Sequence, residues 1–211
     1  MRQPIKFLPY LKTTDWGGEG ISRFKGLKIN CKNIGESWEL SAEPGCESIV
    51  MDGTDCGMTL ADMVTKYKEN LVGQSVYTRY GNEFPLVVKF IDDHNRLWVQ
   101  MHPRHAGPDT TPCRYSPQPT AIPDLSQNLL RSEFCHINKE VVRGQRHLTN
   151  PHDSFMGLVC VEGNGSLKVD GISTSVRQGE SLLLPAHTDN FDVEGTLSLL
   201  TIVIPTLLDA D

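Results

Sequence analysis

The chain has 211 residues, of which 38% are hydrophobic and 22% charged, so it can form the core of one large or two small globular domains. Its formal net charge of −6, without a basic cluster, argues against nucleic acid or an anionic membrane as a partner. Small molecules and other proteins remain candidate partners. No segment approaches the roughly 20 apolar residues that span a bilayer, and the start lacks a signal-peptide pattern, so we expect a cytoplasmic protein.

The six cysteines are scattered along the chain and form no Cys-x-x-Cys pair of the kind used for zinc or redox chemistry. We interpret them as reduced, mostly structural thiols. Cys160, within Leu-Val-Cys-Val, is expected to pack like a small hydrophobic residue.

The first part of the chain shows a strand pattern followed by a helix pattern. Residues 27–50 contain two runs of alternating polar and apolar residues, separated by a Lys-Asn-Ile-Gly turn, which is typical of half-buried strands. From Thr59 to Leu71, apolar residues recur every three or four positions. This predicts one short amphipathic helix, capped by Thr59 and ended by Gly73.

Residues 84–103 predict two strands joined by a turn, and the second strand carries the clearest functional signal. Because side chains alternate across a strand, Trp98, Gln100 and His102 share one face, opposite an apolar face. A glutamine and a histidine that point into a barrel can supply two ligands to a divalent metal. The same pair also fits a plain hydrogen-bonded polar pair.

The second half reads as a connector followed by many short strands. Six prolines between positions 103 and 123 predict an extended connector over residues 104–130. Beyond it, β-prone runs separated by Gly-Asn-Gly, Asp-Gly and Gln-Gly-Glu turns indicate an antiparallel sandwich or barrel without helices. The predicted strands are residues 134–148, 155–161, 166–169, 172–176, 181–184 and 197–204.

Several motifs, in order, resemble the amino-terminal part of class I mannose-6-phosphate isomerases. They are Trp16-Gly-Gly, Ile34-Gly-Glu-Ser-Trp-Glu-Leu-Ser and Phe84-Pro-Leu-Val-Val-Lys, within roughly residues 5–105. The runs beginning at Leu158 and Gln178 resemble the second cupin barrel of the shorter bacterial members. The resemblance implies a cupin with one divalent metal, usually zinc, that interconverts mannose 6-phosphate and fructose 6-phosphate by moving a proton between neighbouring carbons.

The resemblance assigns roles to three residues and leaves others without a counterpart. It implies that Gln100 and His102 are the first two metal ligands and that Trp16 walls the sugar pocket. The family's glutamate ligand, its last histidine ligand and its arginine-bearing catalytic segment have no counterpart, because the proline-rich connector occupies that interval. We therefore expect a shortened form that lacks the middle catalytic segment, and we assign no catalytic residue.

Two further residues are candidates for substrate binding. Trp98 stands where the family usually has a small serine, and its indole would fill space that a hexose phosphate needs. Lys89 interrupts an apolar run, and both a phosphate and a structural carboxylate are open as its partner. The candidates to complete a metal shell are Glu36, His105, His147, His152 and His187.

The sequence predicts an all-β fold with minor helix, built of cupin-like jelly-roll barrels of which the first is partial. The expected organisation is a partial cupin half (1–103), the connector (104–130) and a carboxyl-terminal cupin-like domain (131–211). Because the missing strands would expose sheet edges, we expect a homo-oligomer, as a homodimer or by strand exchange.

The leading functional prediction is a mannose-6-phosphate-isomerase-like protein of sugar-phosphate metabolism with a depleted metal and catalytic site, so that efficient isomerisation is not expected. Two alternatives stay open. One is a non-catalytic cupin that binds a sugar, a small ligand or a protein partner. The other is an active metal-dependent isomerase with a rebuilt zinc site.

Overall fold

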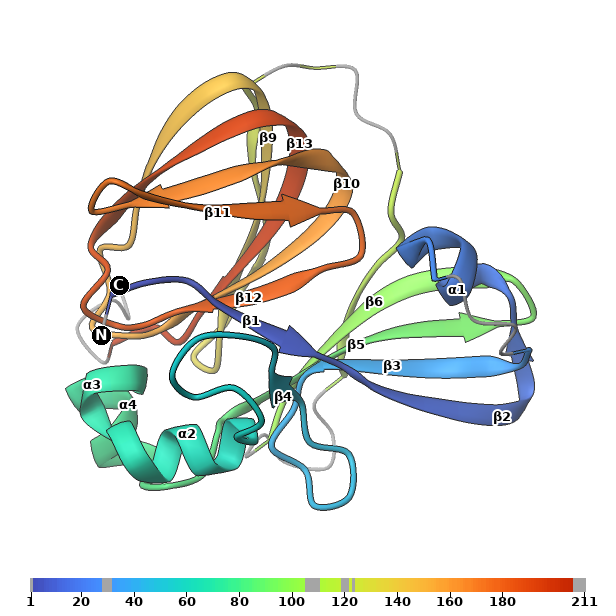
Figure 1. The fold of residues 1–211 in the computed structure, drawn as a ribbon, viewed down its shortest axis with the longest axis horizontal. Coiled ribbons are helices and arrows are strands. Elements are labelled where there is room, and N and C mark those ends of the chain that lie inside the picture. The colour runs from blue at the N-terminus through green and yellow to red at the C-terminus, as the bar shows by residue number, and fades with distance from the viewer. Residues whose placement is uncertain (1, 28–31, 105–110, 119–121, 123, 207–211) are drawn as a thin grey trace.

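A computed structural model describes residues 2–27, 32–104, 111–118, 122 and 124–206, and it confirms an all-β fold with minor helix (Figure 1). The five-stranded sheet runs in the order β2 (Tyr10–Gly18), β3 (Ile34–Leu40), β5 (Leu86–Asp93), β6 (Arg96–Pro103), β7 (Cys113–Tyr115). The eight-stranded sheet runs in the order β4 (Ile49–Val50), β1 (Ile5–Leu8), β12 (Ser181–Leu184), β10 (Met156–Val169), β13 (Asn190–Val203), β9 (His136–Thr149), β8 (Ser126–Arg131), with β11 (Ile172–Arg177) beside β10.

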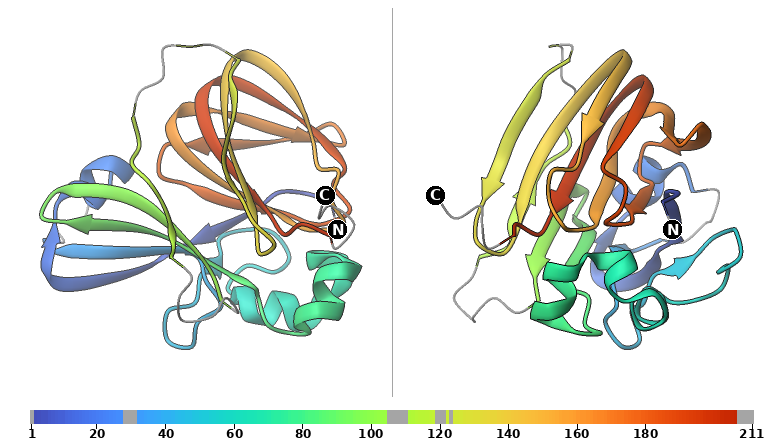
Figure 2. Two further views of the ribbon diagram at one scale, coloured as in Figure 1. Left: turned by 180° about the vertical axis from the view of Figure 1, so that it is seen from behind. Right: turned by 90° about the vertical axis from the view of Figure 1, so that its left-hand side faces the viewer.

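The two sheets differ in shape. The larger sheet curves into a barrel, whereas the smaller one extends away from it with β2 and β7 at its ends (Figures 1 and 2). The first strand of the chain belongs to the larger sheet, because β1 pairs with β12 through Ile5 and Leu183. The amino terminus is therefore tied into the carboxyl-terminal barrel.

Two hydrophobic cores follow from this arrangement. One lies inside the barrel and is built from alternate residues of its strands, such as Leu158, Leu182 and Leu199, all fully buried. The other contains residues of the outer barrel face, such as Leu183 and Leu200, together with residues of the smaller sheet and the helices. Both faces of the barrel strands are thus buried over much of their length.

The helical segment is broken where the sequence predicts one helix. Two short helices, α2 (Leu60–Tyr67) and α3 (Glu69–Val72), replace it, and a third, α4 (Gln74–Tyr80), lies beyond the predicted end. Thr59 does cap α2, in a capping box with Asp62, and Gly73 does end α3. Lys68, at φ +50°, turns the chain so that the carbonyls of α3 accept hydrogen bonds from the barrel. Neither this break nor α1 (Gly20–Lys25) carries a signal in the apolar periodicity.

The Gly-Asn-Gly motif lies inside a strand, which corrects its interpretation as a turn. Gly163 to Gly165 continue β10 along β13, and Gly165 stands opposite Gly195, which in turn stands opposite Gly144 of β9. A Cβ on Gly165 would lie 2.2 Å from the carbonyl oxygen of Glu194. The row of glycines allows neighbouring strands to approach closely, so β10 and β13 run longer than predicted.

The proline-rich interval contains two strands, and each lies at the end of a sheet. β7 is the last strand of the smaller sheet, and β8 is the last strand of the larger sheet, beside β9. Neither strand contains a proline, and the prolines that flank them limit their pairing, because proline has no N–H to donate. The strand expected from Leu27 to Cys31 falls largely outside the described residues.

No helix in the described part of the chain is both long and apolar enough to cross a membrane.

The five described cysteines are free thiols, and their burial predicts how they react. Burial raises the pKa of Cys135 to about 11 and that of Cys160 to about 12. Because the thiolate is the reactive form, we expect iodoacetamide to modify exposed Cys56 in the native protein and to leave Cys135 and Cys160 unmodified. Peptide mass spectrometry before and after unfolding tests this. Rapid native labelling of Cys160 would contradict it.

Candidate functional site

The strand β6 presents three of the predicted site residues on one face. Val99 and Met101 are fully buried in the core, whereas Trp98, Gln100 and His102 are only partly buried. The predicted alternation of the two faces is therefore confirmed. We call the partly buried surface the Gln100 face, and by strand register it contains Glu36, Trp38, Lys89, Trp98, Gln100, His102 and Arg114.

The neighbours of Gln100 across the sheet are both cationic. Lys89 of β5 stands opposite it on one side, and Arg114 of β7 stands opposite it on the other. Two positive side chains next to a potential ligand raise the energy of a divalent cation placed there.

Lys89 is held by residues of β3. Its Nζ lies 3.5 Å from Oε2 of Glu36 and 4.3 Å from the centre of the Trp38 ring, and its side chain is 16% exposed. Glu36 also lies 4.0 Å from Lys12. An ion pair combined with an aromatic contact restricts the lysine, in agreement with the structural carboxylate that the sequence left open as its partner. Its role in substrate binding stays a prediction.

Trp98 is covered by an arginine. The guanidinium of Arg114 lies 5.4 Å from the centre of the indole ring. The Nε1 atoms of Trp98 and Trp38 are buried and have no hydrogen-bond partner among the described residues. Buried donors without acceptors are rare in native proteins, so these two indoles mark an unusual part of the face.

Trp16 lies at the other end of the sheet from His102. The N–H of His94, in the β5–β6 turn, donates to the Trp16 carbonyl (3.1 Å), and Gly17 pairs with Asp93. His102 stands opposite Val87, which precedes Asp93 by six residues on β5. The backbone at His102 therefore lies about 20 Å from the backbone at Trp16 and Gly17. The structure groups Trp98, Lys89, Gln100 and His102, but it places Trp16 apart from them.

The metal site implied by the resemblance does not fit the part of the surroundings of His102 that the structure describes. Catalytic zinc usually has three protein ligands. The described residues contain no group of three or more histidine, cysteine, aspartate or glutamate side chains that could hold a metal. Gln100 and His102 offer two donors, and Glu36, the carboxylate of the Gln100 face, is engaged by Lys89 and Lys12. We therefore derive no chemical step through a metal.

The other candidate ligands belong elsewhere. His147 pairs with Asp192 on the barrel (2.9 Å), and His152 lies beside His136, their ring centres 5.5 Å apart. His187 is exposed just after β12. Glu36 is engaged by two lysines. His105 lies outside the described residues.

Two members of the face were not predicted from the sequence. Trp38 is separated from Glu36 by one residue, so strand alternation would have placed it on the same face. Arg114 gave no such signal, because it lies among prolines in the interval interpreted as a connector. Only the pairing of β7 with β6 brings it beside Gln100.

Comparison with known proteins identifies a matching family for each half of the chain. The family "Phosphomannose isomerase type I, catalytic domain" matches residues 5–125, and "Mannose-6-phosphate isomerase, cupin domain" matches residues 126–204. A mannose-6-phosphate isomerase of Bacillus subtilis (strain 168) is 34% identical over 101 residues, which are 48% of this chain and 30% of that protein. One from Streptococcus mutans is 31% identical over 106 residues, 50% of this chain and 32% of that protein. The match thus spans about a third of each relative's length.

Solved structures show the same fold. The mannose 6-phosphate isomerase from Bacillus subtilis aligns with a TM-score of 0.71 and 16% identity over 95% of this chain and 99% of that one. The Salmonella typhimurium enzyme, solved with its substrate f6p and zinc, aligns with a TM-score of 0.72 and 11% identity over 96% of this chain and 99% of that one. With one family description covering more than half of the chain and a second covering the barrel, the protein belongs to the type I mannose-6-phosphate isomerases of the cupin superfamily.

Proposed function

We propose that this protein is a cytoplasmic, sugar-phosphate-binding member of its family. Its site no longer supports efficient isomerisation. The observation that carries the proposal is the environment of Gln100. Its partners across the sheet are Lys89 and Arg114, where a metal site needs carboxylate or imidazole ligands. The zinc bound by the Salmonella typhimurium relative belongs to that protein.

The same face retains features that suit a sugar phosphate. Arg114 is exposed and supplies a planar guanidinium for an anionic group, and Trp98, Gln100 and His102 beside it are only partly buried. Without a metal to hold the sugar oxygens and without a placed proton carrier, binding of the substrate is not followed by fast proton transfer. The proposal therefore agrees, for the Gln100 face, with the alternative of a non-catalytic cupin that binds a sugar.

Metal content and turnover test the proposal together. We expect less than stoichiometric zinc in the purified protein and a rate of fructose 6-phosphate formation about 10²–10⁴-fold below that of the Bacillus subtilis relative assayed beside it. The double variant Gln100→Ala/His102→Ala should show the same zinc content and the same residual rate as the parent protein. Stoichiometric zinc that disappears in this variant, together with turnover similar to the relative's, would show an active isomerase with a rebuilt site.

Trp98 and Arg114 determine where a sugar can lie. Because the stacked pair fills the space next to Gln100, we expect soaked mannose 6-phosphate to lie outside the stack, displaced from Gln100. Clear sugar density between Trp98 and Gln100 would contradict the proposal that Trp98 and Arg114 occlude the substrate position.

We also propose that the protein is a homodimer through the β4 edge of the larger sheet. β4 is a two-residue strand at the end of that sheet, and Ile49 and Leu8, which pair there, are 37% and 54% exposed. Residues 57–60 cover the backbone of this edge, for example through the N–H of Val50, which donates to the Met58 carbonyl (2.9 Å), so the exposed apolar side chains are what favours association with another chain. We expect a dimer mass in light scattering and a monomer mass for Ile49→Glu. A monomeric parent protein would contradict this.

A further inference from the structure

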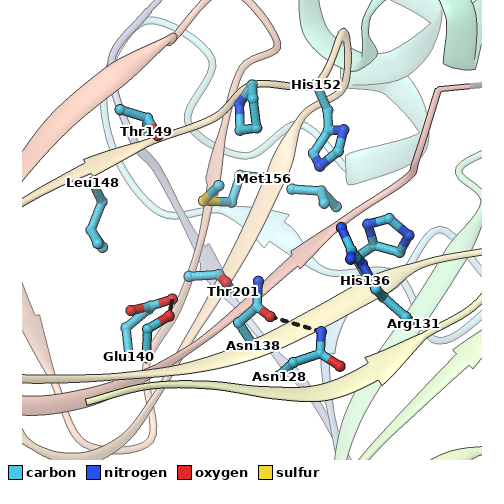
Figure 3. Close-up of a pocket in the computed structure, with 13 residues that line it drawn as sticks. Asn128, Arg131, His136, Asn138, Glu140, Leu148, Thr149, His152, Met156 and Thr201 are labelled. Carbon is cyan, nitrogen blue, oxygen red and sulfur yellow. Dashed lines mark hydrogen bonds between the residues drawn. The ribbon is translucent and has the colours of Figure 1, made fainter. Parts of the chain in front are cut away.

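A polar pocket lies at one end of the barrel interior, and none of its lining residues belongs to the Gln100 face. Its volume is about 570 Å³, within the range of small-molecule sites. We call it the barrel pocket, and we define it by Arg131, His136, Asn138, Glu140, His152 and Thr201, which line it (Figure 3).

The pocket interrupts an otherwise apolar interior. Along β9, the inward positions are His136, Asn138 and Glu140, and only then Val142, which belongs to the inner core. Thr201 of β13 stands opposite Asn138. His136, Glu140 and Thr201 are only 8%, 6% and 5% exposed. Burial of polar groups costs free energy unless hydrogen bonds compensate it, so such a row calls for a function or for complete internal pairing.

The pairing inside this row is incomplete. The Thr201 hydroxyl makes no hydrogen bond to another described residue, although the residue is buried. Oε1 of Glu140 accepts a hydrogen bond from Ser126 (2.8 Å), whereas Oε2 lies 3.2 Å from the Arg146 guanidinium without hydrogen-bond geometry. Oδ1 of Asn138 accepts a hydrogen bond from Asn128 (3.0 Å). The Thr201 hydroxyl thus lines the pocket without an internal hydrogen bond among the described residues, and Oε1 of Glu140 can accept a further hydrogen bond besides that from Ser126.

The two ends of the pocket differ in chemistry. Figure 3 shows Arg131, His136 and His152 gathered at one side, with Glu140 at the other side and Asn138 and Thr201 between them. The first side offers a guanidinium and two imidazoles, which suit an anionic group. The second side offers a carboxylate, an amide and a hydroxyl, which suit hydroxyl groups. The contact with Arg146 offsets the charge of Glu140, so this carboxylate repels an anion less.

We propose that the barrel pocket binds a small polyhydroxylated anion, either a sugar phosphate or a sugar acid. The anionic group lies against Arg131 and the two histidines, and the hydroxyl groups lie against Thr201, Asn138 and Glu140. This site is separate from the Gln100 face, so it does not depend on the function proposed there.

Isothermal titration calorimetry with three probes tests the site: mannose 6-phosphate, gluconate and inorganic phosphate. We expect mannose 6-phosphate or gluconate to bind at least about tenfold more tightly than inorganic phosphate, because the hydroxyl side takes part. Which of the two binds more tightly identifies the anionic group. Absence of binding by all three probes overturns the proposal, and equal binding of inorganic phosphate overturns the role of the hydroxyl side.

Four variants locate the binding. Arg131→Gln, at an exposed position, should weaken binding about tenfold, and Thr201→Val about fivefold. Thr201→Val removes a hydroxyl that has no partner among the described residues, so its thermal stability should be equal to or above that of the parent protein, which separates lost binding from misfolding. Arg177→Gln, at an exposed position of the same barrel outside the pocket, and Arg23→Gln, at an exposed position of α1, should bind as the parent protein does. Unchanged binding by the two pocket variants, or loss in either control, overturns the assignment.

Discussion

Replacement of Glu39 by alanine is expected to lower the free energy of unfolding by about 3–5 kcal/mol. The Glu39 side chain is 1% exposed, and its carboxylate lies 2.7 Å from Nζ of Lys25, which is itself 8% exposed. Ser37 of β3 and Ser181 of β12 donate two further hydrogen bonds to it (2.5 and 3.0 Å). The group therefore joins α1, β3 and the barrel. Its removal leaves the Lys25 ammonium buried without a counter-ion.

Urea unfolding measures this loss, and an exposed pair provides the matched control. Glu19 and Arg23 lie 3.9 Å apart with side chains 61% and 74% exposed, so Glu19→Ala should cost less than about 1 kcal/mol. The double variant Lys25→Met/Glu39→Leu should lose less stability than Glu39→Ala, because it leaves no buried charge. Equal small losses for Glu39→Ala and Glu19→Ala would show that the buried pair does not hold the two sheets together.

Replacement of Gly73 by alanine is expected to lower the free energy of unfolding by about 2–6 kcal/mol. Gly73 links α3 to α4 at φ +96°, a backbone conformation that costs side-chain-bearing residues about 1–3 kcal/mol. A Cβ there would also lie 2.3 Å from the carbonyl oxygen of Asp153, in the loop between β9 and β10. The Asp153 carboxylate accepts hydrogen bonds from the N–H groups of Gln74 (3.1 Å) and Ser75 (2.8 Å). The added methyl group therefore pushes the barrel loop away from the start of α4.

Gly81 separates the two effects. It also has a positive φ, +59°, but no atom lies within 4 Å of the position that an added Cβ would take, so Gly81→Ala carries the backbone cost alone, about 1–3 kcal/mol. We expect Gly73→Ala to be the more destabilising of the two by about 1–3 kcal/mol in urea unfolding. The same loss for both variants would show that the loop moves aside freely.

The sequence predicted the local features whose cause is local. The alternation around Gln100 and His102 identified the two faces of β6, and Thr59 identified the start of α2. Motifs spread over both halves identified the family. These signals depend on strand periodicity, on capping and on short runs of residues, none of which requires knowledge of distant partners.

The tertiary structure alone decided what each face meets. Along β9 the sequence alternates His136, Asn138 and Glu140 with Ile137, Lys139 and Val141, and a two-residue period would direct the more apolar side to the core and the more polar side to solvent. Both sides are buried, because the outer barrel surface belongs to a second core and the polar side lines a pocket. Arg114 also lies beside Gln100 because of a tertiary contact, the pairing of β7 with β6, which no periodicity of the sequence encodes. Periodicity fixes which residues share a face, but only contacts between distant strands determine whether that face is core, site or surface.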